Sequence, residues 1–397
     1  MSLDVATIRK DFPVLSERIN DKPLVYLDSA NTSQKPRVVI DALAEFMATQ
    51  NAPINRSAYH LAAQATERFE STRSKIATFI NAPHAHEVIF TKNATESLNL
   101  AILSWGRANL ASGDVVLLTH MEHHANIVPW HMLVAERGIV LRWVPLTNDF
   151  QLDLTDLDAL LTGAKVFSFT SMSNVLGTIN PVERLCAAAH RAGALAIVDA
   201  CQSVPHQPTD VQAWGADLVA FSSHKMCGPS GVGILWGREE LLNAMPPFLG
   251  GGNMIADVRV DGFTTAPLPN KFEAGTPAIR SGRPRRSRRL PHGSRHARGA
   301  APRDRTVELR PRDAEGSLRR RHHDPRAVEP GGSWRDVLLC VPRHPSARPE
   351  PGARPAQRVR ARGSPLRQAL DAPDRGERDG ARELLSVQHD RRGRRLG

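Results

Sequence analysis

The chain of 397 residues has few cysteines and no long apolar run, and both shortages exclude classes of protein. Its four cysteines, Cys186, Cys201, Cys227 and Cys340, have neither the CxxC nor the Cys/His spacing of a structural zinc site. We therefore expect a reducing compartment and no metal. No apolar run approaches the length of a membrane span, and the N-terminus lacks a basic-then-apolar signal. The expected location is the cytoplasm, with no membrane partner.

Positive charge is confined to the last third of the chain. The overall formal charge of +11 would suggest an anionic partner if it were evenly spread. Residues 1–279 hold 21 Lys and Arg against 27 Asp and Glu, whereas residues 280–397 hold 31 against 14, and all 31 are arginine. The second segment has no Lys, Ile, Phe, Tyr, Asn or Met, so it has few side chains with which to build a core. The composition therefore changes at about residue 279, from one that can build a core to one that is rich in arginine and poor in core residues.

Residues 1–279 alternate short apolar runs with longer amphipathic segments. The runs lie at 87–91, 114–119, 139–144, 165–170, 194–199, 217–222 and 231–236. Strands that are apolar on both faces and alternate with helices are typical of a mainly parallel sheet covered by helices. We predict an α/β fold with a seven-stranded sheet, whose ligands bind at the carboxyl ends of the strands.

Reactive and polar side chains follow these runs. Asn93 and Glu96 have capping-box spacing at the start of a helix, whose free N–H groups and the Thr95 hydroxyl suit a phosphate. Asp199 ends one run, and Lys225 follows another, just before a glycine-rich turn. Each alone has an ordinary structural explanation as a cap, a turn or a solvated lysine. Together they supply a phosphate cradle, a carboxylate and a nucleophilic lysine, the set that pyridoxal 5'-phosphate (PLP) requires.

Six longer stretches resemble one known family. They are "VYLDSANTSQKP", "NATESLNLAI", "MEHHANIVPWHML", "SNVLGTINP", "VDACQSVPHQPTDVQAWGADLVAFSSHKMCGP" and "FEAGTP". In this order they resemble the SufS-type (group II) cysteine desulfurases of aminotransferase class V, over residues 1–279. The resemblance implies the aspartate-aminotransferase-like fold, PLP-transferase fold type I, with residues 1–279 as the PLP-binding large domain.

The resemblance also implies a role for each site residue. Lys225 would form a Schiff base with PLP, and Asp199 would pair with the pyridine nitrogen. The other implied roles are Gln202 at the ring hydroxyl, His123 stacked on the ring, Asn174 near the ring oxygen and substrate, Thr95, Ser222 and His224 at the phosphate, and Thr276 at the phosphate of the partner subunit in a homodimer.

The implied reaction converts L-cysteine to L-alanine and leaves a persulfide on an enzyme thiolate, for a sulfur-acceptor protein of iron–sulfur cluster assembly. None of the four cysteines fits the thiolate. Cys227 is close to Lys225, but we expect a strand-like stretch there that turns its side chain away. Cys186 and Cys201 are interpreted as packing residues.

Several positions depart from the family pattern near the substrate entrance and the lysine. Asn55 and Ser57 stand in "NRSAYH" where the family has HRGxH, although Arg56 and His60 remain. Ser223 replaces a glycine beside the lysine, and Asn31 replaces an alanine or glycine. These changes leave the substrate choice and the rate open.

Residues 280–397 contain neither the "RxGHHCAxP" segment that carries the family's thiolate nor its "RAS…YNT" segment. When each codon of "RARGSPLRQALDAP" (360–373) is shifted forward by one base, wobble positions permit VRAGHHCAKPLMR. The same shift of "ARELLSVQHDRRGRRLG" (381–397) permits RASFYLYNTTAEVDAL. We therefore interpret residues from about 280 onward as an out-of-frame translation of the family's small C-terminal domain, and expect a disordered tail and impaired activity.

Two alternatives stay open. One is another class V PLP lyase or transaminase that needs no cysteine nucleophile, such as an enzyme acting on L-selenocysteine or kynurenine. The other is a non-enzymatic protein whose arginine-rich tail binds nucleic acid, although interleaved aromatic residues are missing there except for Trp334.

Overall fold

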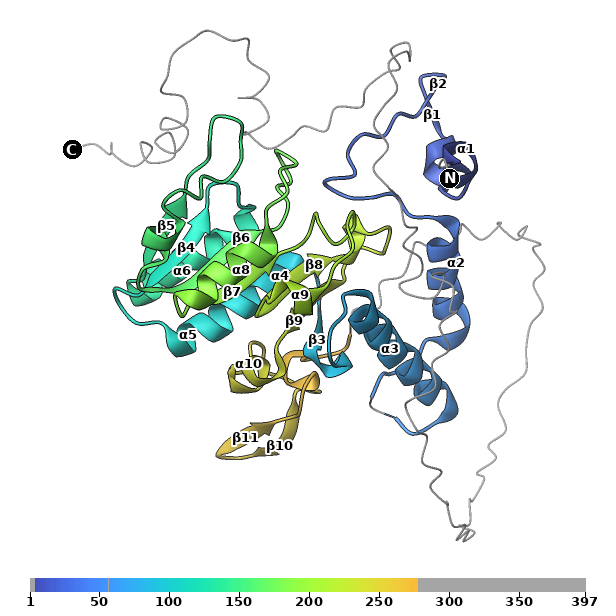
Figure 1. Cartoon of the computed structure of the whole chain (residues 1–397). Coiled ribbons are helices and arrows are strands. Elements are labelled where there is room, and N and C mark those ends of the chain that lie inside the picture. The colour runs from blue at the N-terminus through green and yellow to red at the C-terminus, as the bar shows by residue number, and fades with distance from the viewer. Residues whose placement is uncertain (1–3, 56, 278–397) are drawn as a thin grey trace, which may run out of the picture.

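The computed structural model describes residues 4–55 and 57–277. Its centre is a seven-stranded sheet with the strand order β3-β9-β8-β7-β6-β4-β5, shown in Figure 1. The strands are β3 (Val88–Thr91), β4 (Val115–Thr119), β5 (Val140–Val144), β6 (Ala164–Thr170), β7 (Leu195–Asp199), β8 (Leu218–Ser222) and β9 (Gly233–Gly237). Each agrees with a predicted apolar run to within two residues, so the predicted α/β fold with a seven-stranded sheet is confirmed.

One strand runs against the others. β9 pairs antiparallel with both β3 and β8, whereas the pairs among β8, β7, β6, β4 and β5 are parallel. The stretch from Lys225 to Val232 returns the chain directly to the sheet without a crossover helix, and a short connection can join only antiparallel neighbours. The carboxyl ends of β3, β4, β6, β7 and β8 therefore share one edge.

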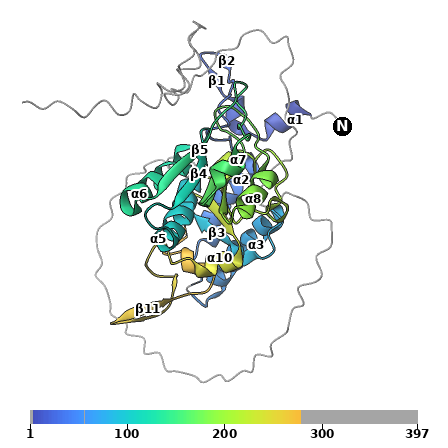
Figure 2. The same ribbon diagram turned by 60° about the vertical axis from the view of Figure 1, so that its left-hand side comes forward.

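Helices cover both faces of the sheet (Figures 1 and 2). On one face lie α4 (Ala94–Asn99), α5 (Trp105–Asn109), α6 (Val128–Arg137) and α10 (Glu239–Ala244), with a π-helical turn (Leu100–Ser104) joining α4 to α5. On the other lie α3 (His60–Phe79), α7 (Leu157–Leu161), α8 (Val182–Arg191) and α9 (Val211–Trp214). Successive residues of a strand point to opposite faces of the sheet. Leu117 packs on the face covered by α8, and Val116 packs on the face covered by α6.

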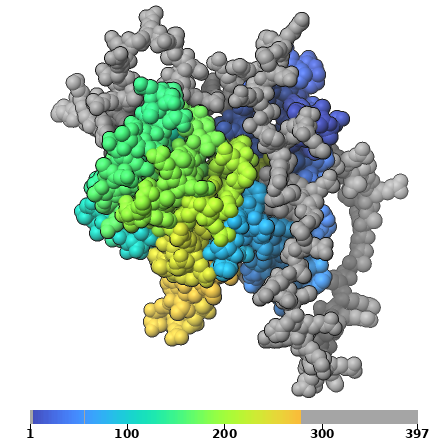
Figure 3. All heavy atoms as spheres, viewed as in Figure 1, coloured from blue at the N-terminus to red at the C-terminus, as the bar shows by residue number. Residues whose placement is uncertain are grey.

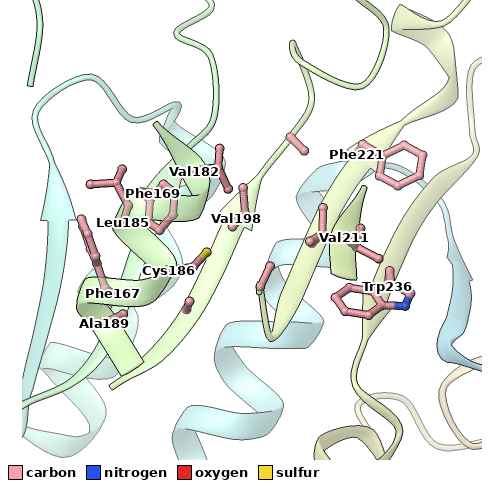
Figure 4. Packing of buried hydrophobic residues seen from close by; sticks show 14 of the residues in the cluster. Phe167, Phe169, Val182, Leu185, Cys186, Ala189, Val198, Val211, Phe221 and Trp236 are labelled. Atoms are coloured by element: carbon pink, nitrogen blue, oxygen red, sulfur yellow. The ribbon is translucent and has the colours of Figure 1, made fainter. Parts of the chain in front are cut away.

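Aromatic side chains fill the space between the sheet and α8. Phe167 and Phe169 project from β6 against α8, and their rings lie 4.7 Å apart (Figure 4). Cys186 of α8 is fully buried among them. Burial raises the pKa of its thiol to about 12. The prediction that Cys186 is a packing residue is confirmed.

The remaining elements lie outside the sheet. The N-terminal part contains α1 (Val5–Lys10), the short pair β1 (Arg18–Ile19) and β2 (Lys22–Pro23), and α2 (Arg37–Glu45). At the other end of the described part, β10 (Ile255–Arg259) and β11 (Gly262–Thr265) form a hairpin that projects from the body of the molecule (Figure 3).

Some predictions fall outside the described residues. These are Arg56, Cys340 and the whole of the out-of-frame segment 280–397. Within residues 4–55 and 57–277, no helix is long and apolar enough to cross a membrane.

Candidate active site

A cavity of 240 Å³ opens at the carboxyl edge of the sheet. It is bounded by residues that follow β3, β4, β6, β7 and β8, as the α/β topology predicts. Eight of the nine predicted site residues line it: Thr95, His123, Asn174, Asp199, Gln202, Ser222, His224 and Lys225. These eight residues lie up to 130 positions apart in sequence and are brought to one cavity.

Lys225 ends the short 3-10 turn Ser223–Lys225 that follows β8. Its side chain is half-buried, and no hydrogen bond or ion pair holds the ammonium among the described residues. The amine therefore faces the cavity without a protein partner that would have to be displaced. This is the condition that a nucleophilic lysine needs.

Asp199 is the last residue of β7 and is 3% exposed. Its Oδ1 accepts a hydrogen bond from the Cys201 N–H at 3.0 Å, which fixes the carboxylate at the floor of the cavity. The carboxylate also forms a hydrogen bond with the Cys201 thiol, which contributes to raising the pKa of that thiol. A carboxylate has about four acceptor sites, so some remain for a cationic or N–H group in the cavity.

The start of α4 forms another wall. Asn93 caps the helix by accepting the Glu96 N–H at 2.8 Å, so the predicted N-cap is confirmed. Glu96, however, accepts from the N–H of Lys92 rather than from that of the cap residue. The Ser222 hydroxyl accepts the Ala94 N–H at 3.3 Å, which joins β8 to the helix start. The helix start that carries Thr95 is therefore held by its own cap residue and by a hydrogen bond to β8.

Gly233, at the start of β9, is needed for this wall. A Cβ atom at Gly233 would lie 2.2 Å from the carbonyl carbon of Asn93 and 2.4 Å from its oxygen. Both are backbone atoms and cannot rotate away, so only glycine lets β9 approach the helix start this closely.

His123 lies after β4, directly before the 3-10 turn His124–Asn126. Its Nδ1 accepts the Ala125 N–H at 3.1 Å, which leaves the rest of the ring directed at the cavity. Burial lowers the pKa of His123, Asp199 opposes this effect, and Lys225 adds to it. A neutral imidazole suits stacking on a flat ring more than hydrogen bonding to an anion.

Behind His123 lies a buried carboxyl that the sequence analysis missed. Glu122 accepts hydrogen bonds from the Thr119 hydroxyl (2.5 Å), the Asn126 amide (2.7 Å) and the Thr170 N–H (2.8 Å). Burial raises its pKa to about 8 against these donors, and the charge of Asp199 adds to the rise. Its position beside His123 in "MEHH" is the signal that could have marked it.

Gln202 and Asn31 show how the N-terminal segment closes the cavity. Gln202 donates to the carbonyl of Ala30 at 2.7 Å, so one amide hydrogen is used and the other is free for a ligand. Asn31, one of the departures from the family pattern, lines the cavity itself.

The other departures lie away from the cavity lining. Ser223 is fully buried and donates to the carbonyls of Pro229 and Val232, so its hydroxyl serves the turn after β8. Asn55 has a positive φ of 58°, a conformation that asparagine tolerates. His60 begins α3, and neither His60 nor Ser57 lines the cavity.

Thr276 is the one predicted site residue that the structure places elsewhere. It lines a separate cavity of 360 Å³ between α3 and the end of the described chain. A buried ion pair anchors this segment: Glu273 accepts from Arg73 at 2.6 and 2.9 Å and from the Phe90 N–H at 2.7 Å. Thr276 therefore does not contact a ligand in the 240 Å³ cavity of its own subunit.

Two cysteine predictions need correction. Cys201 was interpreted as packing, but it lines the 240 Å³ cavity, although burial raises its pKa well above 9 and keeps it a thiol. The stretch from Lys225 to Cys227 is not strand-like, because it leaves a 3-10 turn and Cys227 has a φ of 61°. Cys227 nevertheless does not line the cavity, as we expected. The reason is the turn conformation at Cys227 and not a strand-like stretch.

The sheet order defines an α/β protein whose carboxyl edge brings a lysine, an aspartate and a histidine to one cavity. Residues 25–281 match the family model described as aminotransferase class-V. The chain belongs to the aminotransferase class-V family.

The chain is similar to a "Probable cysteine desulfurase" of Synechocystis, 51% identical over 275 residues, which are 69% of this chain and 66% of that protein. A "Probable cysteine desulfurase" of Streptomyces coelicolor is 53% identical, over 70% of this chain and 68% of its own. Among solved structures, a cysteine desulfurase from Thermococcus onnurineus has a TM-score of 0.66 and 37% identity, over 70% of this chain and 68% of that one. The cysteine desulfurase CsdA from Escherichia coli has a TM-score of 0.64 and 38% identity, over 70% and 69%. The chain thus spans about two thirds of the length of these relatives.

Proposed function

We propose that residues 1–279 are the PLP-binding large domain of a cysteine desulfurase of the SufS type, which converts L-cysteine to L-alanine. The single observation that carries the proposal is the set of eight side chains around one cavity, each of a type that PLP requires. The names of the similar proteins support the substrate.

The residues present fit the cofactor. The cavity offers an unpaired lysine, a buried carboxylate with unused acceptor sites and a helix start with polar hydroxyls. In this proposal Lys225 attaches PLP covalently, Asp199 keeps the pyridine nitrogen protonated and His123 covers the ring face. Gln202 uses its second amide hydrogen for the ring hydroxyl, and Asn174 lies near the ring oxygen and the substrate.

The phosphate would be held by Thr95, Ser222 and His224. Burial and the nearby charges of Lys225 and Lys35 lower the pKa of His224, so His224 would act as a neutral donor. Thr276 would reach the phosphate of a partner subunit in a homodimer.

When bound, PLP withdraws electrons from the substrate Cα. Lys225 would serve as the base that moves the proton at that carbon. The sulfur must then pass to an enzyme thiolate. Burial raises the thiol pKa of both Cys186 and Cys201, which removes the thiolate form at neutral pH.

We further propose that the thiolate belongs to the small domain that the frame change from about residue 280 removes. The shifted reading places its cysteine codon across Leu366 and Arg367. The chain as written would then bind PLP and fail to release sulfur, and a sulfur-acceptor protein would have no persulfide to accept.

The cofactor site is tested first. Purified protein is incubated with PLP and reduced with borohydride, and the modified peptide is identified by mass. We expect PLP on Lys225, loss of the label in Lys225→Ala, and no change in Lys22→Ala, an exposed lysine distant from the cavity. Labelling spread evenly over surface lysines would refute the site.

The activity is tested by supplying L-cysteine and measuring alanine and persulfide. We expect neither from the chain as written. We expect both after the deletion of one nucleotide near codon 280, which makes the shifted frame the one that is translated. Resequencing of codons 270–290 and an intact mass of the protein check which frame is read. Alanine from L-selenocysteine or kynurenine without the frame change would favour another PLP lyase. Steeply salt-dependent RNA binding without PLP binding would favour a nucleic-acid binder.

A further inference from the structure

The N-terminal segment from Asp28 to Lys35 lies against the turn that carries Lys225. Two contacts define its path: the Tyr26 hydroxyl donates to the Thr32 carbonyl at 2.7 Å, and Gln202 donates to the Ala30 carbonyl at 2.7 Å. The segment therefore crosses the sheet's carboxyl edge about 190 residues before the lysine turn in sequence.

The carbonyl of His224, directly before Lys225, receives an unusual number of donors from this segment. They are the Ser33 N–H (3.0 Å), the Ser33 hydroxyl (3.0 Å), the Thr32 hydroxyl (3.1 Å) and the Lys35 ammonium (3.0 Å). A carbonyl oxygen has two lone pairs, so four donors on one oxygen leave it little freedom to move.

The same segment holds the other end of the turn. The Cys227 N–H donates to the Ser33 hydroxyl at 2.7 Å. Ser33 therefore contacts the turn on both sides of Lys225, two residues after it and one residue before it. The backbone that carries the reactive lysine is fastened to a part of the chain outside the sheet.

Lys35 is costly to place here for stability alone. Its ammonium is half-buried and donates to the carbonyls of Ser33 and His224, and within residues 4–55 and 57–277 no carboxylate compensates its charge. Burial lowers the pKa of Lys35, and the charge of the Cys227 sulfur partly opposes this effect. A half-buried cation that donates to backbone carbonyls is explained by what it holds, which here is the turn that carries Lys225.

We propose that Lys35 is a positioning residue for Lys225: it holds the His224 carbonyl so that Lys225 enters the cavity in the orientation that captures an anionic aldehyde such as PLP. The inference rests on the proposed PLP site, but the fastening of the turn can be measured without the cofactor. Charge-assisted hydrogen bonds of this kind are about twice as strong as neutral ones.

The test compares Lys35→Met with Lys22→Met, an exposed lysine of the same N-terminal part, in the full chain. In the cofactor-free protein we expect amide exchange at residues 226–228 to rise about tenfold in Lys35→Met, and exchange in β7 (195–199) to stay unchanged. PLP affinity should fall by about tenfold, as expected for the loss of one charge-assisted hydrogen bond. Lys22→Met should behave as the wild type in both measurements.

A second variant, Ser33→Ala, removes two contacts to the same turn and keeps Lys35. It should also weaken PLP binding, which keeps the test decisive if Lys35→Met does not fold. Unchanged PLP affinity in both variants, or an exchange increase spread evenly over the sheet, would overturn the proposal. If the wild type itself does not bind PLP, the proposed function fails, and the exchange at 226–228 alone decides the role of Lys35.

Discussion

Glu122 makes the stability of this protein depend on pH in a direction opposite to that of an ordinary carboxylate. Its folded-state pKa of about 8 is raised from an ordinary value of 4.5, so the folded protein holds this proton more tightly than the unfolded chain does. The contribution of Glu122 is therefore fully present below pH 4.5 and is lost as pH rises through about 8. Between pH 5 and pH 8, at 1.36 kcal/mol per pH unit, the loss is about 4 kcal/mol.

Glu122→Gln isolates this effect because glutamine does not titrate and most of the hydrogen bonds of Glu122 can be kept. The amide oxygen can accept from Thr119 and Thr170, as the carboxylate does. The new amide hydrogens face Asn126, which can turn its own amide by 180° and then donate to the Ser168 hydroxyl. The turned Asn126 no longer accepts from the buried Ser168 hydroxyl, and one of the two new amide hydrogens has no acceptor among these residues, so we expect a loss of stability that is the same at every pH. The variant removes the titration, and only the pH dependence is compared.

The assay is urea unfolding of the cofactor-free protein at pH 5 and pH 8, for the wild type, Glu122→Gln and Glu67→Gln, an exposed control in the middle of α3. We expect the free energy of unfolding to fall from pH 5 to pH 8 by about 4 kcal/mol more in the wild type and the control than in Glu122→Gln. An identical pH dependence in all three proteins would refute the reasoning.

Two further predictions concern the walls of the site. Gly233→Ala forces a Cβ into the Asn93 backbone, so we expect a loss of stability of about 1–3 kcal/mol or more and weaker PLP binding, whereas Gly262→Ala, with nothing within 4 Å, should change neither in thermal melts and PLP titrations. Arg73→Met leaves Glu273 buried without its partner, so we expect the free energy of unfolding in urea to fall by about 3–5 kcal/mol. The double variant Arg73→Met/Glu273→Met should recover most of this loss. A single variant as stable as the wild type would contradict a stabilising role for the ion pair.

The sheet could be predicted from sequence because its strands are buried on both faces. Burial forces continuous apolar runs, and runs of this kind depend only on neighbouring residues. The same local patterns marked Lys225, Asp199 and the Asn93 cap, since each lies at the end of a strand or within three residues after it. The direction of β9 could not be predicted this way, because an apolar run carries no information on which neighbour it pairs with.

Sequence by itself determined where the composition changes, at about residue 279, and which side chains are candidates for the chemistry, because composition and strand-end positions are properties of the linear chain. Only the tertiary structure decided which of them meet. It separated Thr276 from the other eight, placed Cys201 in the cavity and fastened the Lys225 turn to Lys35. These contacts join residues far apart in sequence, and their geometry is set by how the helices and strands pack rather than by any local spacing.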